Sequence, residues 1–166
     1  IAPRELEQTG ADIGDMARAL GEILEVDADH VQQKAEDKSL RYHALGEFDK
    51  AMLKLLRKYN QLGQGYAWNQ AMYDGDQVMV YNHGTVVYVF NWNPTRSVPD
   101  YVVPVPEAGS YKIILSTDEE RCGGFERNEL GGEFLSFSRK CDDGVVRHYI
   151  RIYNVARTAT VYKKVE

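Results

Sequence analysis

The sequence predicts a mainly β protein: an antiparallel β-sandwich of seven or eight strands, preceded by a short α-helical segment. Three observations lead to this prediction. Short runs rich in Val, Ile, Tyr, Phe and Thr follow one another about every ten residues from Gln77 onward. Turn residues (Gly, Asn, Asp and Pro) separate these runs. The most apolar run, Thr85–Asn91, is apolar on both faces, which is typical of a central strand covered on each side.

The first third of the chain carries helical patterns. Apolar residues recur at helical spacing from Asp12 to Leu24, which predicts one short amphipathic helix in an N-terminal segment of residues 1–36. The first residue is Ile1 rather than Met, so we expect the chain to be a piece of a longer polypeptide.

A second helical pattern follows in residues 37–73, which we assign to a helical linker segment. Glycine lowers helix stability by about 1 kcal/mol relative to alanine, so we expect one helix to end at Gly46 and another to span about Glu47 to Tyr59. Residues 74–166 then form the predicted C-terminal β-sandwich.

The sandwich begins with a predicted hairpin. Gln77–Tyr81 and Thr85–Asn91 form its two strands, and the Asn and Gly between them tolerate the positive φ of a tight turn. Pro94 and Pro99 follow, and we expect them to stop regular pairing because proline cannot donate to a ladder. Further runs predict the remaining strands: Asp100–Val105, Tyr111–Leu115, Glu133–Arg139, Val146–Tyr153 and Thr158–Lys163.

Composition excludes several classes of protein. Twenty basic and 25 acidic side chains give a net charge of −5, and without a basic run the chain is not expected to bind nucleic acid. It has no membrane-spanning stretch and no signal-peptide pattern. Cys122 and Cys141 are too few for a disulfide framework or a four-thiolate zinc site, and we expect reduced thiols in a cytoplasmic protein.

We predict no catalytic residue, metal or cofactor site in this chain. The four histidines have no partners at metal-ligand spacing, and His148 is expected to be a hydrogen-bonded core residue. No Gly-x-Ser-x-Gly pattern supports a serine hydrolase. The carboxylates of Asp118–Glu120 and Asp142–Asp143 lie in predicted turns, where we expect them to point into water rather than face one another across a cleft.

Aromatic residues are the best candidates for a binding site. Trp92 and Tyr101 flank the proline-marked loop 93–99. Flat rings can stack on the apolar faces of sugars, and they can equally pack one domain against another. On the rings alone we favour the packing role, because large aromatic residues supply most of the buried area in cores and interfaces.

An ordered string of motifs resembles the C-terminal region of 1,4-α-glucan (glycogen) branching enzymes of the α-amylase superfamily. The resemblance covers Asp37 to Val165. The chain departs from the family pattern at Val102, at Phe125 with Glu126, and at Val155. The motifs are Leu40–Met52, Phe90-Asn91-Trp92-Asn93-Pro94, Ser97–Tyr101, Ala108–Tyr111, Gly123-Gly124 and Arg157-Thr158-Ala159.

The resemblance implies a glycosyltransferase parent of glycogen biosynthesis, which transfers an α-1,4-glucan segment to a 6-hydroxyl and forms an α-1,6 branch. The family's catalytic carboxylates lie in a (β/α)8 barrel, and this sequence has no βα repeat. We therefore expect a non-catalytic domain that stabilises the barrel, its partner, and contacts α-glucan at Trp92 and Tyr101. The alternatives are a free-standing carbohydrate-binding module for α-glucans and a purely structural interaction domain.

Overall fold

The computed structural model describes residues 37, 39, 40, 42–63 and 65–165. The helix predicted at Asp12–Leu24 lies outside these residues. The chain divides into two compact units, Ile1–Gly46 and Glu47–Glu166, and the second holds the sandwich. The three-part division that we placed after residues 36 and 73 stays a prediction.

A single helix, α3 (His43–Lys58), replaces the two helices that we predicted. The prediction of a break at Gly46 is wrong because one glycine costs only about 1 kcal/mol, and burial of apolar side chains further along the helix exceeds that cost. From Glu47 onward, Phe48, Met52 and Leu55 pack into an apolar cluster with the sheet.

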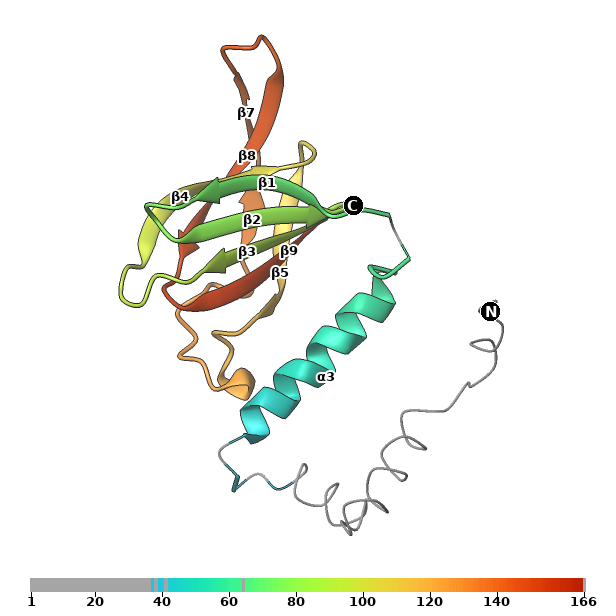
Figure 1. The fold of residues 1–166 in the computed structure, drawn as a ribbon, viewed down its shortest axis with the longest axis vertical. Helices are drawn as coiled ribbons and strands as arrows, with labels where there is room; N and C mark the ends of the chain where they lie inside the picture. Colours follow the sequence, from blue (N-terminus) through green and yellow to red (C-terminus); the bar gives the residue numbers. More distant parts are fainter. Residues whose placement is uncertain (1–36, 38, 41, 64, 166) are drawn as a thin grey trace, which may run out of the picture. The chain divides into compact units, whose positions relative to one another are not determined.

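Two antiparallel sheets confirm the predicted β-sandwich (Figure 1). The strands of the larger sheet run in the order β1-β2-β3-β9-β5-β6, and those of the smaller sheet in the order β4-β8-β7. The bounds are β1 Trp68–Tyr73, β2 Val78–His83, β3 Val86–Asn91, β4 Val98–Val105, β5 Ser110–Ser116, β6 Glu133–Leu135, β7 Phe137–Lys140, β8 Val146–Asn154 and β9 Thr158–Lys164, with a short 3₁₀ helix at Glu120–Cys122.

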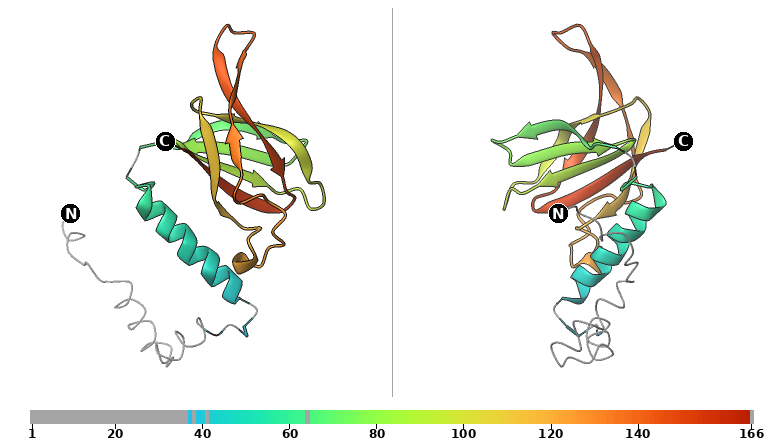
Figure 2. Two further views of the ribbon diagram at one scale, coloured as in Figure 1. Left: turned by 180° about the vertical axis from the view of Figure 1, so that it is seen from behind. Right: turned by 45° about the vertical axis from the view of Figure 1, so that its right-hand side comes forward.

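The main core lies between the two sheets, which face one another in Figure 2. Alternate residues of each strand point into it, as the period of two requires. Val80, Val87 and Tyr162 come from the larger sheet, and Val103 and Ile150 from the smaller one. All five side chains are almost completely buried.

A second apolar cluster covers the outer face of the larger sheet. Tyr88 of β3, Leu115 of β5 and Val161 of β9 meet Leu55 and Met52 of α3 there. This is why Val86–Asn91 is apolar on both faces: its two sets of side chains enter two different cores. The predicted central strand is therefore confirmed, with β2 on one side of β3 and β9 on the other.

The sequence did not predict strand β1. It pairs with β2 and occupies Trp68–Tyr73, within the stretch that we assigned to a helical linker. A bulge between Asn69 and Ala71 interrupts the pairing, so the alternation of apolar and polar residues is broken.

Pro94 lies in the loop between β3 and β4, as expected, whereas Pro99 lies inside a strand whose pairing is irregular there. β4 begins at Val98 and contains both Pro99 and Pro104. Its pairing with β8 shifts between Val98 and Tyr101, where Asp100 has a φ of 53°. Pro99 thus lies in a bulge. Pro104 lies in an edge strand of the smaller sheet, and one side of an edge strand makes no hydrogen bonds to a neighbouring strand, so proline is tolerated there.

The replacement of Gly46 by alanine is expected to raise the free energy of unfolding by about 0.5–1 kcal/mol. The added methyl group meets no described atom within 4 Å, and alanine restricts the unfolded chain more than glycine does. Urea denaturation measures the change. An unchanged or lower midpoint would contradict a continuous helix through this position.

Candidate functional site

Trp92 lies directly after β3 with 56% of its surface exposed. Its backbone N–H donates to the Gln77 carbonyl oxygen at 2.9 Å. The ring stacks on Phe90, with the centroids 5.3 Å apart and an interplanar angle of 11°. The indole is therefore held in a fixed orientation while much of its surface stays open to solvent.

Trp92 ends a row of four stacked rings on the outer face of the larger sheet. Tyr81 stacks on Tyr88 at 4.6 Å and on Phe90 at 5.8 Å. Burial, and to a smaller extent the neighbouring Tyr81, raises the pKa of Tyr88 to about 12, so its hydroxyl stays neutral at physiological pH. The row supports Trp92 from behind and makes it a rigid platform.

A depression of about 330 Å³ opens beside Trp92. Two of its lining residues, Thr117 and Ala159, are joined by a reciprocal pair of hydrogen bonds: each backbone N–H donates to an oxygen of the other residue, and both distances are 3.0 Å. The lining residues are Phe90, Asn91, Trp92, Thr117, Arg157, Thr158 and Ala159.

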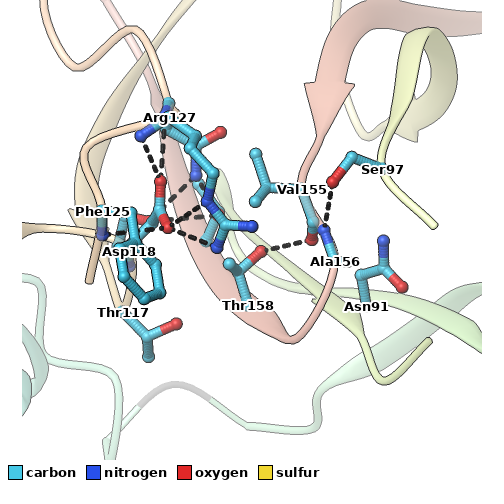
Figure 3. Close-up of polar contacts among 12 residues, drawn as sticks. Asn91, Ser97, Thr117, Asp118, Phe125, Arg127, Val155, Ala156 and Thr158 are labelled. Atoms are coloured by element: carbon cyan, nitrogen blue, oxygen red, sulfur yellow. Dashed lines mark hydrogen bonds and ion pairs between the residues drawn. The ribbon is translucent and has the colours of Figure 1, made fainter. Parts of the chain in front are cut away.

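Arg157 supplies the cationic side of the depression. Its side chain is exposed, and its φ of 57° lies in the left-handed region. A non-glycine residue held there costs about 1–3 kcal/mol, and such strain is concentrated at functional sites. The turn is secured by Ser97 Oγ, which accepts from the Ala156 N–H at 3.0 Å, and by Thr158, whose hydroxyl donates to the Val155 carbonyl at 2.8 Å (Figure 3).

Tyr101, the other sequence-predicted binding residue, lies on the inner side of the sandwich. Its ring packs against the main core and meets Tyr73 edge-on, with centroids 5.9 Å apart. Its hydroxyl donates to Asp76 Oδ2 at 3.0 Å. Burial, together with this hydrogen bond and the Asp76 charge, raises the pKa of Tyr101. The structure therefore does not bring Trp92 and Tyr101 together, and their contact with sugar stays a prediction.

The expectation that the turn carboxylates point into water is wrong for Asp118. Its side chain is 1% exposed. The Arg127 guanidinium donates to Oδ1 from Nε at 2.9 Å and from Nη2 at 2.6 Å, and the backbone N–H groups of Arg127 and Asn128 donate to Oδ2 (Figure 3). The carboxylate thus fixes the loop that follows Thr117, one of the residues that line the depression.

His148 is half-buried, and its Nδ1 lies 2.9 Å from the hydroxyl oxygen of Ser138. Cys122 and Cys141 are free thiols. Among the described residues, no three His, Cys, Asp or Glu side chains come together in a group that could hold a metal ion. In the same part of the chain, no helix is long and apolar enough to cross a membrane.

Comparison with known proteins assigns the fold to a family. Residues 68–165 match the family described as "Alpha amylase, C-terminal all-beta domain". The chain belongs to this family. An alpha-amylase C-terminal all-beta domain that starts at residue 68 includes β1, the strand that sequence patterns did not predict.

Relatives of this C-terminal all-beta domain carry the name 1,4-alpha-glucan-branching enzyme. The protein from Emericella nidulans is 37% identical over 124 residues, which are 75% of this chain and 18% of the relative. The protein from Saccharomyces cerevisiae is 31% identical over 127 residues, 76% of this chain and 18% of the relative. An Arabidopsis thaliana relative, a "1,4-alpha-glucan-branching enzyme 2-2, chloroplastic/amyloplastic", is 33% identical over 74% of this chain and 15% of its own length.

These matches confirm the resemblance that the motifs indicated. The chain spans less than a fifth of the length of the curated relatives that it matches. Sequence reasoning missed Arg157 and Thr117 as lining residues of the site. The Arg157-Thr158-Ala159 motif was the available signal for the arginine, whereas nothing in the sequence indicates Thr117.

Proposed function

We propose that this chain is the C-terminal domain of a 1,4-α-glucan-branching enzyme, and that it supports a catalytic (β/α)8 barrel without contributing a catalytic residue. The match to the C-terminal all-beta family carries the proposal. Support also comes from the names of the relatives and from the small fraction of each relative that the chain covers. The parent would transfer an α-1,4-glucan segment to a 6-hydroxyl by a retaining double displacement at carboxylates of the barrel.

An apolar surface supports the barrel as a partner. A groove of about 570 Å³ runs between α3 and the outer face of the larger sheet, with Phe48, Leu56 and Tyr81 among its lining residues. Leu62 and Tyr66 nearby in the chain are largely exposed. Contiguous apolar surface of this kind marks an interaction site. We propose that the barrel covers it.

The Trp92 depression supports contact with α-glucan. A rigid, half-open indole offers a flat apolar surface to a pyranose ring. The Arg157 guanidinium beside it offers donors for sugar hydroxyls. The Tyr101 hydroxyl is already bonded to Asp76, so we assign the stacking role to Trp92.

Replacement of Trp92 by alanine is expected to weaken binding of maltoheptaose by about tenfold, because the stacking surface is lost. Isothermal titration with the 166-residue chain measures this, and we expect the unaltered chain to bind with a Kd of about 1 mM or below.

Trp68→Ala is the matched control. Trp68 is 69% exposed and does not line the depression, so its removal should leave maltoheptaose binding unchanged. Equal losses in both variants, or no response of the unaltered chain up to about 10 mM, would overturn the glucan contact. Neither result would affect the assignment of the domain.

A free-standing module for α-glucans is the second candidate, because the exposed Trp92 ring and Arg157 line the same depression. Sequencing the transcript upstream of the codon for Ile1 separates the two. An in-frame region encoding a (β/α)8 barrel is the expected result, and a transcript without one would favour the module. A cytoplasmic location and the absence of nucleic-acid partners stay predictions.

A further inference from the structure

The β7–β8 hairpin projects beyond the body of the sandwich (Figure 1). Ile150 and Ile152 of β8 point into the main core, so the residues that alternate with them lie on the outer face of the smaller sheet. This face belongs neither to the Trp92 depression nor to the groove beside α3.

Rings and arginines alternate on this outer face. Phe137 is paired with Tyr149, and their rings stack with centroids 5.8 Å apart. The Arg151 guanidinium lies 5.1 Å above the centroid of Phe137. Two residues further along each strand, toward the hairpin tip, Arg139 lies directly opposite Arg147. Three cations therefore surround two stacked rings.

The arrangement carries an excess of positive charge. Like charges placed directly opposite on neighbouring strands destabilise the pair. Asp143 compensates Arg147, since its Oδ1 accepts from Nη1 at 3.1 Å. In the described part of the chain, neither Arg139 nor Arg151 has an acidic partner, and the Arg151 guanidinium lies over the Phe137 ring. Two exposed guanidinium groups are thus available on a chain whose net charge is −5.

We propose that this face is a second carbohydrate-binding site, which takes a phosphate monoester carried on an α-glucan. The Arg139 guanidinium would bind the phosphate, because its planar fork matches the oxygens, and the Arg151 charge on the same face would add to the attraction. The stacked rings would contact the adjoining glucose, as aromatic faces do. Only the glucan half of this proposal rests on the proposed function, whereas the anion half stands on the uncompensated charge.

The test compares binding of three probes to the 166-residue chain at low ionic strength: maltoheptaose bearing one 6-phosphate, unmodified maltoheptaose, and inorganic phosphate. We expect the phosphorylated maltoheptaose to bind at least about tenfold more tightly than either of the others. The advantage should fall steeply as salt is added, because exposed charges are screened.

Arg139→Gln is expected to abolish this advantage while leaving the binding of unmodified maltoheptaose unchanged. Trp92→Ala should weaken the binding of unmodified maltoheptaose and leave the advantage of the phosphorylated form in place. The two variants therefore separate the two sites. Without ligand, Arg139→Gln should also raise the Tm by about 1–3 °C, because the opposed arginines are relieved. That shift shows that the variant is folded.

Three results would overturn the proposal. Equal affinities for the two maltoheptaoses would show that the face does not recognise the phosphate group. If inorganic phosphate binds as tightly as the phosphorylated sugar, the face does not recognise the glucan. Tighter, Arg139-dependent binding of poly-glutamate would identify the face as a site for an acidic protein segment instead. If unmodified maltoheptaose fails to bind but the phosphorylated form binds through Arg139, the Trp92 site fails and this site stands.

Discussion

Replacement of Asp118 by alanine is expected to lower the free energy of unfolding by about 3–5 kcal/mol. The carboxylate is almost completely buried and accepts hydrogen bonds from the Arg127 guanidinium and from backbone N–H groups of Arg127 and Asn128. Its removal leaves a partly buried cation without its counter-charge and buried donors without acceptors. Urea denaturation of the 166-residue chain measures the loss.

Hydrogen exchange at the amides of Arg127 and Asn128 gives an independent readout, since their protection should fall even under native conditions. Glu107→Gln is the matched control: this carboxylate also binds a cation, Lys164, but its side chain is 53% exposed. We expect no measurable change there, because solvent screens exposed pairs. A midpoint for Asp118→Ala within error of the unaltered chain would show that the loop is held by other contacts.

Gly124→Ala is expected to lower the free energy of unfolding by about 3 kcal/mol. An added Cβ would lie 2.1 Å from the carbonyl carbon of Asp118 and 2.2 Å from its oxygen, so the backbone must move apart. The movement would disturb the Glu126 N–H bond to the Asp118 carbonyl, now 2.8 Å, and the Gly124 N–H bond to the Glu119 carbonyl, now 3.0 Å. Thermal and urea unfolding both measure the effect.

Gly131→Ala is the control: it distinguishes the close approach of Gly124 to Asp118 from the general effect on stability of replacing a glycine. A Cβ at position 131 meets no described atom within 4 Å, so the free energy of unfolding should change by less than about 0.5 kcal/mol. Equal stabilities of the two variants would contradict the close approach of Gly124 to Asp118. A large loss at position 124 alone would confirm it.

Sequence patterns predicted the turns and strands whose conformation depends on their own residue types. The hairpin of β2 and β3 was predicted from two apolar runs around a glycine, and Gly84 indeed has a φ of 59°. The Asp142–Gly144 turn was predicted in the same way, and Gly144 has a φ of 80°. The predicted strand Val146–Tyr153 corresponds to β8, and its alternation places Ile150 and Ile152 in the core. In each case the residue type itself favours the backbone conformation or the buried face.

Patterns were less informative where a strand changes partner or alternation. Glu133–Arg139 was predicted as one strand, but it divides at Ser136 into β6 of the larger sheet and β7 of the smaller one. No local property of Ser136 indicates that division. Strand β1 was missed because its bulge breaks the period on which the prediction depends.

The fold class, the family and Trp92 as a candidate binding residue follow from the sequence alone, because alternation, turn residues and ordered motifs are local features of the chain. The folded structure was needed to show that Trp92 lies beside Arg157 and Thr117 rather than Tyr101, and that Asp118 is buried. It also decided that Arg139 opposes Arg147. These relations depend on strand register and loop closure between distant residues, which no local pattern encodes.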